Sequence, residues 1–414
     1  MSLRLAFDVR TTHETGISRY GLSILKHFPL HFSGARLQLY VLHRPRQAAT
    51  LRDIVSDRDR EYVHLIEIVE DEQYVRRSQW VRSFLLEEKI DLLYTTHYLL
   101  DPLSPVPFVY TIHDLLYFKY PELAPSNSTF SERFGVAELD ILQESLSSLS
   151  EYRRSADAVL SNDSLFFQYF AAVNRCLATK AAHIVTVSQT SKSDITHYLG
   201  INESKISIVL PGVSREVFYR RDAEDVRKVQ QQFAIEGPYC LYVGLGYPHK
   251  RLRWLTETLE QVKSRLPIKW RFIVVGGDTI LYEDVAEYVE QSDLANFVYF
   301  TGRVTDEQLA ALYSGASAYV TASLNEGNNL PPLEALNCGC EVIAPAIPSF
   351  LEPLGRDAHF YSVNDRERLG DMIVHALTGR LERKAVGSVY RPDWDQSAQD
   401  LLAVLENIWT GLEH

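Results

Sequence analysis

Short apolar runs of strand length alternate with helical stretches along the whole chain, and this alternation constrains the fold more than any other feature. In the first half, strands are expected at 3–9, 37–42, 63–69, 92–94, 108–112 and 183–187. In the second half, strands are expected at 239–243, 271–275, 298–301, 318–320 and 341–344, with helices at 252–265, 284–292, 306–314 and 331–336. Strands separated by helices form parallel sheets with helices on both faces. We therefore predict an α/β protein made of two doubly wound units in series.

The boundary between the two units is expected near residue 210. A chain of 414 residues is long enough for two domains that each bury a core. The alternation breaks at Pro211 and Gly212, which favours a first domain over 1–210 and a second over 211–390. The last segment, 391–414, holds an amphipathic helical pattern that could pack back on either domain, and we assign it to the N-terminal one.

The connection between the strands at 108–112 and 183–187 is unusually long. Residues 121–182 look mainly helical, with no obvious strand pattern. A helical excursion at the carboxyl end of a strand is where α/β proteins place elements that select a substrate. A structural embellishment or a dimer contact is an equally good interpretation, so the role of this insertion stays open.

Charge and cysteine content exclude several classes of protein. The formal charge of −12 argues against a protein that must neutralise many nucleic-acid phosphates. The charge is uneven: 22 Lys and Arg against 25 Asp and Glu give −3 for 1–210, and 20 against 29 give −9 for the rest. Four cysteines are too few for a disulfide scaffold in so long a chain. Cys338 and Cys340 lack a second Cys or His pair at zinc spacing, so we interpret them as buried thiols.

No targeting or membrane-spanning segment is predicted. The apolar run at the N-terminus has only strand length and is broken by Arg4 and Asp8, so it does not resemble a signal peptide. No run of about 18 uncharged apolar residues is found, so no membrane-spanning helix is expected. We therefore expect a protein of the reducing cytoplasm.

The strongest chemical signal lies at 325–336, which reads NEGNNLPPLEAL. Pro331 suits the first turn of a helix, because an N–H at that position has no helical partner. Glu326 then lies in the loop before the helix, and Glu334 is expected within its first turn. The N–H groups of 327–330 are expected to face an anion, since a helix N-terminus favours negative charge. Glu334 alone could merely complement the helix dipole, but together the two acids could bind hydroxyls of one ligand, which suits a sugar.

This segment resembles the paired-glutamate signature of retaining glycosyltransferases of the family 4 type. The stretch FDVRTTHETGISRYG at 7–21 resembles the family's Gly-Ile-Gly-Arg-Tyr loop, and VGLGYPHKRL at 243–252 resembles its phosphate-binding loop. Residues 301–327 look like the base-binding loop and the helix after it, and His113 and Asp114 follow a strand as the family's His-Asp pair does. The resemblance covers most of the chain except roughly 121–182. It implies the GT-B fold, in which two Rossmann-like domains face each other across a cleft.

The resemblance also implies a role for each matching residue. Glu334 should hold the ribose hydroxyls, Glu326 the hydroxyls of the donor sugar, and Lys250 the diphosphate. Lys250 is also chemically apt, because a fixed cation stabilises charge that develops on a departing phosphate. His113 would lie beside the reacting sugar as a catalytic residue together with Glu326. The remaining donor-binding positions are Gly16, Arg251, Arg303, Val304, Gly327, Asn328, Asn329 and Leu330.

Simpler interpretations exist for several of these residues, and two positions depart from the family pattern. Taken alone, Lys250 could be a solvated lysine, Gly16 a turn glycine and His113 a core histidine. Leu245 stands where many relatives have an arginine, so one phosphate cation is missing unless His249 or Arg251 replaces it. Ser18 replaces the second glycine of the first loop, which weakens the case for close backbone approach there.

The implied reaction moves a hexose from a nucleotide diphosphate sugar, with UDP or GDP as the expected carrier, to a hydroxyl of a glycan or lipid-linked acceptor. The anomeric configuration would be retained, and neither a metal nor another cofactor is expected. The N-terminal domain would meet the acceptor, with peripheral contact at the inner face of the membrane. Rival interpretations are a sugar-nucleotide epimerase and an inactive sugar-nucleotide sensor. A retaining hydrolase fits poorly, since it needs two facing carboxylates about 5 Å apart.

Overall fold

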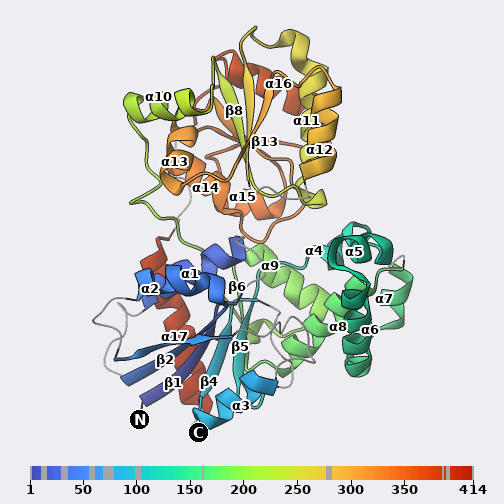
Figure 1. Ribbon diagram of the computed structural model, residues 1–414, viewed down its shortest axis with the longest axis vertical. Coiled ribbons are helices and arrows are strands. Elements are labelled where there is room, and N and C mark those ends of the chain that lie inside the picture. Colours follow the sequence, from blue (N-terminus) through green and yellow to red (C-terminus); the bar gives the residue numbers. More distant parts are fainter. Residues whose placement is uncertain are drawn as a thin grey trace. The chain divides into compact units, whose positions relative to one another are not determined.

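The computed structural model describes residues 2–10, 16–28, 36–55, 61–68, 79–97, 104–160, 163–276, 282–384, 387 and 392–412. Contacts within the chain divide it into two compact units (Figure 1). Unit 1 contains Met1–Gly212 together with Trp394–His414, and unit 2 contains Val213–Asp393. The division follows Gly212, at the break that the sequence shows.

Unit 1 is built, over its described residues, on a seven-stranded parallel sheet with the order β3-β2-β1-β4-β5-β6-β7. The strands are β1 (Ser2–Asp8), β2 (Arg36–His43), β3 (Val63–Glu67), β4 (Leu92–Thr95), β5 (Phe108–Ile112), β6 (His183–Thr186) and β7 (Ile206–Ile208). The strand order reverses between β1 and β4. In doubly wound sheets, ligands bind at such a reversal, beside the carboxyl ends of the strands.

The helices of unit 1 include a cluster that lies beside the sheet (Figure 1). This cluster contains α5 (Asn127–Phe134), α6 (Val136–Ser148), α7 (Ser155–Leu160) and α8 (Leu165–Lys180), and it fills the long connection between β5 and β6. The other helices are α1 (Gly16–His27), α2 (Ala48–Ile54), α3 (Gln79–Glu87), α4 (Leu116–Lys119) and α9 (Gln189–Asp194).

The C-terminal helix α17 (Trp394–Leu412) belongs to unit 1 although it follows unit 2 in the chain. It packs against α1, where His27 Nδ1 and Asp395 Oδ1 lie 2.6 Å apart. The hydroxyl of Ser397 donates a hydrogen bond to the carbonyl oxygen of Leu210 at 2.7 Å. The first unit is therefore completed by the last residues of the chain.

Unit 2 repeats the same winding with a six-stranded parallel sheet in the order β10-β9-β8-β11-β12-β13, again over the described residues. Its strands are β8 (Tyr239–Val243), β9 (Arg271–Val275), β10 (Val298–Gly302), β11 (Ala318–Val320), β12 (Val342–Pro345) and β13 (His359–Tyr361). The order reverses between β8 and β11. The two sheets confirm the predicted fold class of two doubly wound α/β units.

Helices cover both faces of the unit 2 sheet. In Figure 1, α11 and α12 lie on one side of the sheet, and α10 and α13 lie on the other. The helices are α10 (Ala223–Gln232), α11 (Leu252–Val262), α12 (Glu283–Gln291), α13 (Asp306–Gly315), α14 (Leu330–Asn337), α15 (Pro348–Leu354) and α16 (Arg366–Leu377). Because both faces are covered, the inner strands β8 and β12 are buried and apolar almost throughout, whereas β10 at the sheet edge is partly exposed.

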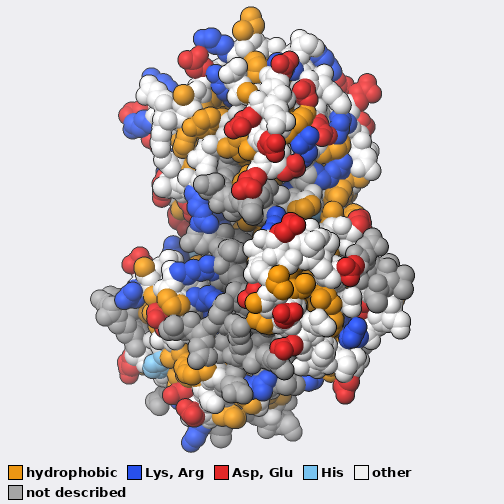
Figure 2. Space-filling model, turned by 45° about the vertical axis from the view of Figure 1, so that its right-hand side comes forward, with side chains coloured by type: hydrophobic (Ala, Val, Ile, Leu, Met, Phe, Trp, Pro, Cys, Tyr) orange, Lys and Arg blue, Asp and Glu red, His pale blue; other side chains and the backbone are white. Residues whose placement is uncertain are grey.

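Among the described residues, neither the surface drawn in Figure 2 nor the cysteines indicate a further functional site. Acidic and basic side chains are interspersed over the face drawn in Figure 2, with hydrophobic areas between them. Within the described part of the chain, none of the helices is long and apolar enough to cross a membrane. All four cysteines are free and buried, and burial raises the pKa of the Cys240 and Cys338 thiols to about 12. These two thiols are therefore neutral at physiological pH.

Candidate functional site

The loop from β11 to α14 is almost entirely buried. Asn325 and Asn329 expose 3% and 7% of their surface, and Ser323 exposes none. Asn329 is the N-cap of α14, and Pro331 lies within the first turn, as predicted. Because Pro331 and Pro332 have no N–H, the first turn of α14 offers fewer backbone donors than an ordinary helix start. An anion at this end of α14 would therefore be bound mainly by the loop amides that precede the helix.

Glu334 does not lie in the first turn of α14, and the prediction that placed it there is wrong. The helix already begins at Leu330, one residue before Pro331, so Glu334 is its fifth residue and the first turn carries no acid. The Glu334 side chain is buried, with 3% of the residue exposed, and Tyr313 donates a hydrogen bond to its Oε2 at 3.4 Å. The helix dipole therefore explains an acidic residue at position 334 less well than the sequence suggested.

Lys250 and Glu326 form an ion pair at the carboxyl edge of the unit 2 sheet. Lys250 Nζ donates to Glu326 Oε1 at 2.8 Å, and the two side chains are only 16% and 11% exposed. The side-chain amide of Asn329 donates to the same oxygen at 3.1 Å. The N–H of Leu324 donates to the carbonyl of His249 at 2.8 Å, which holds the two loops together. The structure thus joins predicted site residues that are 76 positions apart in sequence.

Glu326 is held in its charged form. Burial alone would raise the pKa of this carboxyl, but Lys250, His249 and a hydrogen bond from Ser323 outweigh burial and lower the pKa below its ordinary value. The result is a fixed, partly desolvated anion beside a fixed cation. Such a pair can bind hydroxyls through Glu326 and phosphate oxygens through Lys250.

His249 does not supply the cation that is missing at Leu245. The pKa of His249 is lowered to about 4, chiefly by burial; the charge of Glu326 opposes this shift, and the charge of Lys250 adds to it. The imidazole is therefore neutral at physiological pH in this structure. It can donate or accept a hydrogen bond, but it is not a second fixed charge.

The other predicted donor-binding residues of unit 2 lie around the same sheet edge. Arg251 directs its guanidinium to the carbonyl of Val363, at 2.9 Å, and to the Trp254 ring, 4.1 Å from the ring centroid. Arg303 is exposed and Val304 is half-buried, and both follow β10, two strands away from β8. Gly327 and Leu330 are buried and Asn328 is half-buried in the loop around Glu326. Their donor-binding roles stay predictions.

His113 lies at the carboxyl end of β5 in unit 1, half-buried. Its Nε2 is 2.9 Å from the carbonyl oxygen of Thr96, and the ring meets Tyr20 edge-on at 5.1 Å. Burial lowers the pKa of His113 to about 4, although the bond to Thr96 opposes this shift. Asp114 accepts a hydrogen bond from the N–H of Leu116 at 2.9 Å, so it orders the turn that opens α4.

Gly16 begins α1, after the segment 11–15 that lies outside the described residues. A Cβ added at Gly16 would meet nothing within 4 Å. Neither packing nor a left-handed backbone requires glycine at this position. Close approach of a ligand stays the prediction that would account for it.

Sequence reasoning missed several polar groups at these edges. Arg10 and Asp8 form a buried two-point ion pair at the end of β1, with distances of 2.9 and 2.7 Å. An acidic and a basic residue two positions apart at the end of a predicted strand could have indicated this ion pair. His97 follows β4, and burial together with His113 lowers its pKa to about 3. Its proximity to His113 depends on strand pairing and has no sequence signal. For Asn329, only the backbone N–H was expected to contribute, and the hydrogen bond from its side chain to Glu326 was not predicted.

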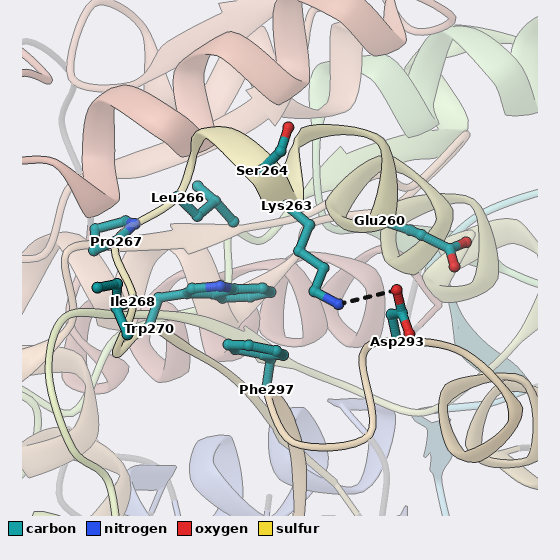
Figure 3. A pocket seen from close by; sticks show the side chains of 9 residues that line it. All are labelled: Glu260, Lys263, Ser264, Leu266, Pro267, Ile268, Trp270, Asp293 and Phe297. Carbon is teal, nitrogen blue, oxygen red and sulfur yellow. Dashed lines mark ion pairs between the residues drawn. The ribbon is translucent and has the colours of Figure 1, made fainter.

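The hollow drawn in Figure 3 lies away from these residues. It has a volume of about 510 Å³ and is lined by Glu260, Lys263, Ser264, Leu266, Pro267, Ile268, Trp270, Asp293 and Phe297. Trp270 and Phe297 precede β9 and β10, so the hollow lies at the amino ends of those strands. No predicted site residue lines it.

Solved structures with a similar fold include glycosyltransferases. The Anabaena protein Alr3699/HepE, solved with UDP and glucose, is similar with a TM-score of 0.64 over 99% of this chain and 98% of its own, at 14% identity. WaaG, a glycosyltransferase of lipopolysaccharide biosynthesis, has a TM-score of 0.62 over 98% and 96%, at 15% identity. Identities this low show the fold alone, and the fold is GT-B.

Family models match both units. One described as "Glycosyltransferase Family 4" matches residues 16–217, and one described as "Glycosyl transferases group 1" matches residues 237–379. The chain belongs to the family 4 type of glycosyltransferases, which confirms the resemblance seen in its motifs.

Curated relatives match about half of the chain. The O-antigen chain mannosyltransferase RfbU of Salmonella typhimurium is 27% identical over 199 residues, which are 48% of this chain and 52% of the relative. The O-antigen chain mannosyltransferase B of Escherichia coli is 29% identical over 199 residues, which are 47% and 51%. The chain thus spans about half the length of the curated relatives it matches.

Proposed function

We propose that this chain is a retaining glycosyltransferase that moves a hexose from a nucleotide diphosphate sugar to a hydroxyl of a glycan or lipid-linked acceptor. The observation that carries the proposal is the partly buried Lys250–Glu326 pair beside the start of α14. A fixed cation and a fixed carboxylate in one loop cluster suit a ligand with both phosphates and hydroxyls. The O-antigen mannosyltransferases among the relatives support mannose as a first candidate sugar and polysaccharide assembly as the setting.

The roles of the unit 2 residues follow from their chemistry. Glu326 accepts hydrogen bonds from the sugar hydroxyls, Lys250 holds the diphosphate, and Glu334 accepts from the ribose hydroxyls. The loop amides of 327–330 bind phosphate oxygens, and Arg303 and Val304 lie beside the base. UDP or GDP is the proposed carrier, and the solved Alr3699/HepE complex with UDP and glucose supports a nucleotide of this kind.

The reaction proposed is a front-side displacement. The bond between the anomeric carbon and the phosphate oxygen breaks, the acceptor oxygen bonds to that carbon on the same face, and the departing phosphate oxygen takes the acceptor proton. The protein mainly positions the reactants and stabilises charge. Lys250 acts on the negative charge that develops on the leaving phosphate, which is a role that a metal ion fills elsewhere. We therefore propose metal-independent transfer.

The unit 1 residues are proposed to contribute to both the donor and the acceptor. His113 is proposed to lie beside the reacting sugar, and Gly16 to let the first loop approach the diphosphate. The helical insertion 121–182 is proposed to help select the acceptor. Peripheral contact of unit 1 with the cytoplasmic face of a membrane belongs to the same proposal, because a lipid-linked acceptor would be presented there.

The first experiment is a screen of uridine, guanosine, adenosine and thymidine diphosphate sugars, with glucose and mannose on each, for binding and slow hydrolysis in the presence of EDTA. We expect binding and hydrolysis with a UDP or GDP sugar. An epimerase would convert the donor sugar with no acceptor present. A sensor would bind the nucleotide with neither transfer nor hydrolysis. Either result overturns the proposal.

Variants of the central pair test the site. Glu326→Gln and Lys250→Met are expected to lower kcat by at least about 100-fold, because each removes a fixed charge at the reacting centre. The exposed Lys269–Glu236 pair of unit 2, at 3.1 Å, gives the matched controls Lys269→Met and Glu236→Gln. These controls should transfer at the wild-type rate. Full activity of either site variant, with an unchanged melting temperature, contradicts the assignment.

A further inference from the structure

Arg251 has an unfavourable backbone conformation directly beside Lys250. Its φ is 53°, in the left-handed region, which residues with an L side chain rarely adopt. Among the described residues, only Lys89, Asp163 and Ala234 share a positive φ without being glycine. Backbone strain of this kind persists only where the surrounding contacts enforce it, and it gathers at functional sites.

Backbone and side-chain contacts both hold this conformation: the N–H of Arg251 donates to the carbonyl of Pro248 at 3.1 Å, and the Arg251 side chain makes three further contacts. Its Nη1 donates to the carbonyl of Val363 at 2.9 Å and to Asn364 Oδ1 at 3.2 Å. Its guanidinium lies over the ring of Trp254, 4.1 Å from the ring centroid, in the first turn of α11. We name Arg251 and its three side-chain partners, Val363, Asn364 and Trp254, the Arg251 clamp. The clamp fastens the start of α11 to the turn that precedes α16.

The clamp and a second restraint bracket Lys250. On one side, the carbonyl of His249 accepts the N–H of Leu324, which ties the 248–250 turn to the Glu326 loop. On the other side, the left-handed Arg251 ends that turn and starts α11. Between these fixed points, the Lys250 side chain runs past Gly244 and ends 2.8 Å from Glu326. Loosening Arg251 would free the main chain next to Lys250 and change the aim of its ammonium group.

We infer that Arg251 is a positioning residue, which aims Lys250 through the clamp rather than binding the donor itself. The inference rests on the proposed function, in which Lys250 stabilises charge on the leaving phosphate. A displaced Lys250 still attracts a bound nucleoside diphosphate, but it no longer matches the charge of the transition state. Misplacement therefore lowers kcat far more than affinity.

The test compares four variants by steady-state kinetics and by calorimetric binding of UDP or GDP, whichever the wild type binds. Arg251→Ala is expected to lower kcat about 10- to 100-fold with nucleotide affinity within about threefold of wild type. Asn364→Ala breaks the clamp from its far side and is expected to give a smaller loss in kcat. The kcat of the double variant should be no lower than that of Arg251→Ala alone, because both substitutions disrupt the same Arg251 clamp. Arg265→Ala, which breaks an exposed ion pair with Asp371, is the control that removes an arginine from the same unit.

Arg251→Gly separates positioning from stability. Glycine tolerates the left-handed backbone, so this variant should melt at or above the temperature of Arg251→Ala. If the clamp aims Lys250, Arg251→Gly stays as slow as Arg251→Ala. A recovery of kcat in Arg251→Gly overturns the inference, because only backbone strain would then matter.

Two further outcomes overturn the inference in different ways. A loss of nucleotide affinity in Arg251→Ala that matches its loss of kcat, with Asn364→Ala at the wild-type rate, shows that Arg251 binds the donor directly. In that case the proposed function stands. A wild-type chain that neither binds nor hydrolyses a nucleotide sugar overturns the proposed function and the clamp with it.

Discussion

Single residues of the site are arranged so that their charges are fixed before a ligand arrives. Lys250 donates to Oε1 of Glu326, and Asn329 adds a second contact to the same carboxylate oxygen. The surrounding loop is buried, so these charges act in a medium less polarisable than water. Groups held in this way need little reorganisation when charge develops on a substrate, which is the main source of electrostatic catalysis.

His113 is fixed in one tautomer by its neighbours. The carbonyl of Thr96 can only accept a hydrogen bond, so the Nε2 that lies 2.9 Å from it carries the proton. With its pKa lowered to about 4 by burial, the ring is neutral, and Nδ1 is left as an acceptor. In the proposed site, His113 therefore accepts from a substrate hydroxyl and does not act as an acid.

This tautomer predicts opposite results for two conservative substitutions. Asn places an oxygen near the position of Nδ1, whereas Gln places its amide near Nε2. We expect His113→Asn to transfer faster than His113→Gln by roughly fivefold, the equivalent of one hydrogen bond of about 1 kcal/mol. Steady-state rates of the two variants check this, with melting temperatures as the folding control. A faster His113→Gln would show that the Thr96 side of the ring matters more.

At the scale of elements, a buried ion pair links two helices of the helical insertion. Arg175 on α8 donates to both carboxylate oxygens of Asp157 on α7, at 2.5 and 2.8 Å, and also to the carbonyl of Tyr152 at 3.2 Å. Both residues expose less than a tenth of their surface. Because the partners lie on different helices, this pair fixes how α7 packs on α8.

Removing one partner of this pair should destabilise unit 1 strongly. We expect Asp157→Asn or Arg175→Met to lower the free energy of unfolding by about 3–5 kcal/mol, since a buried charge is left without its partner. Replacing both, as Asp157→Leu with Arg175→Met, should recover much of that loss. Urea unfolding measures each value. Lys228→Ala, which breaks an exposed pair with Glu224, should change stability by no more than about 0.5 kcal/mol. Equal effects in the buried and exposed pairs would refute this account.

The elements that the sequence predicted well are those with a buried apolar pattern. The expected strand at 239–243 matches β8, and the helical pattern over 394–412 matches α17. β7 and β13 were not predicted, because each is a three-residue strand at a sheet edge and too short to show a period. α10 was missed for a different reason, since Val229 is its only buried residue and its other faces are polar.

For the candidate site, sequence reasoning predicted residue types better than their partners. The loop at 325–336 and Lys250 were identified from motifs, but the contact between Lys250 and Glu326, 76 positions apart, is created only by the folded sheet. The misplaced turn of Glu334 came from treating Pro331 as the first helical residue, whereas Leu330 opens the helix. The direction of the Arg251 side chain could not be predicted, because its partner Val363 lies in a turn more than 100 positions away.

At the scale of the whole molecule, the chain leaves unit 1 at Gly212 and returns to it at Trp394. Each unit has its own apolar core, and the described core clusters contain residues of one unit only. The charge is divided in the same way, with most of the net −12 carried by residues after 210. An anionic donor in the more acidic unit therefore depends on locally placed groups such as Lys250 rather than on bulk charge.

Separate cores predict separate unfolding, and the returning helix allows a test. Trp394 is 3% exposed and meets Tyr20 edge-on at 6.1 Å, so Trp394→Ala should lower the stability of unit 1 by about 3–5 kcal/mol. Calorimetry should then show one transition shifted down and one unchanged. UDP or GDP at about 100 times its Kd should raise the unchanged transition, which is unit 2, by about 2.7 kcal/mol. Trp80→Ala, at a residue 42% exposed in unit 1, is the matched control with a small effect. If Trp394→Ala and the nucleotide shift the same transition, the two units unfold together and the assignment of separate cores fails.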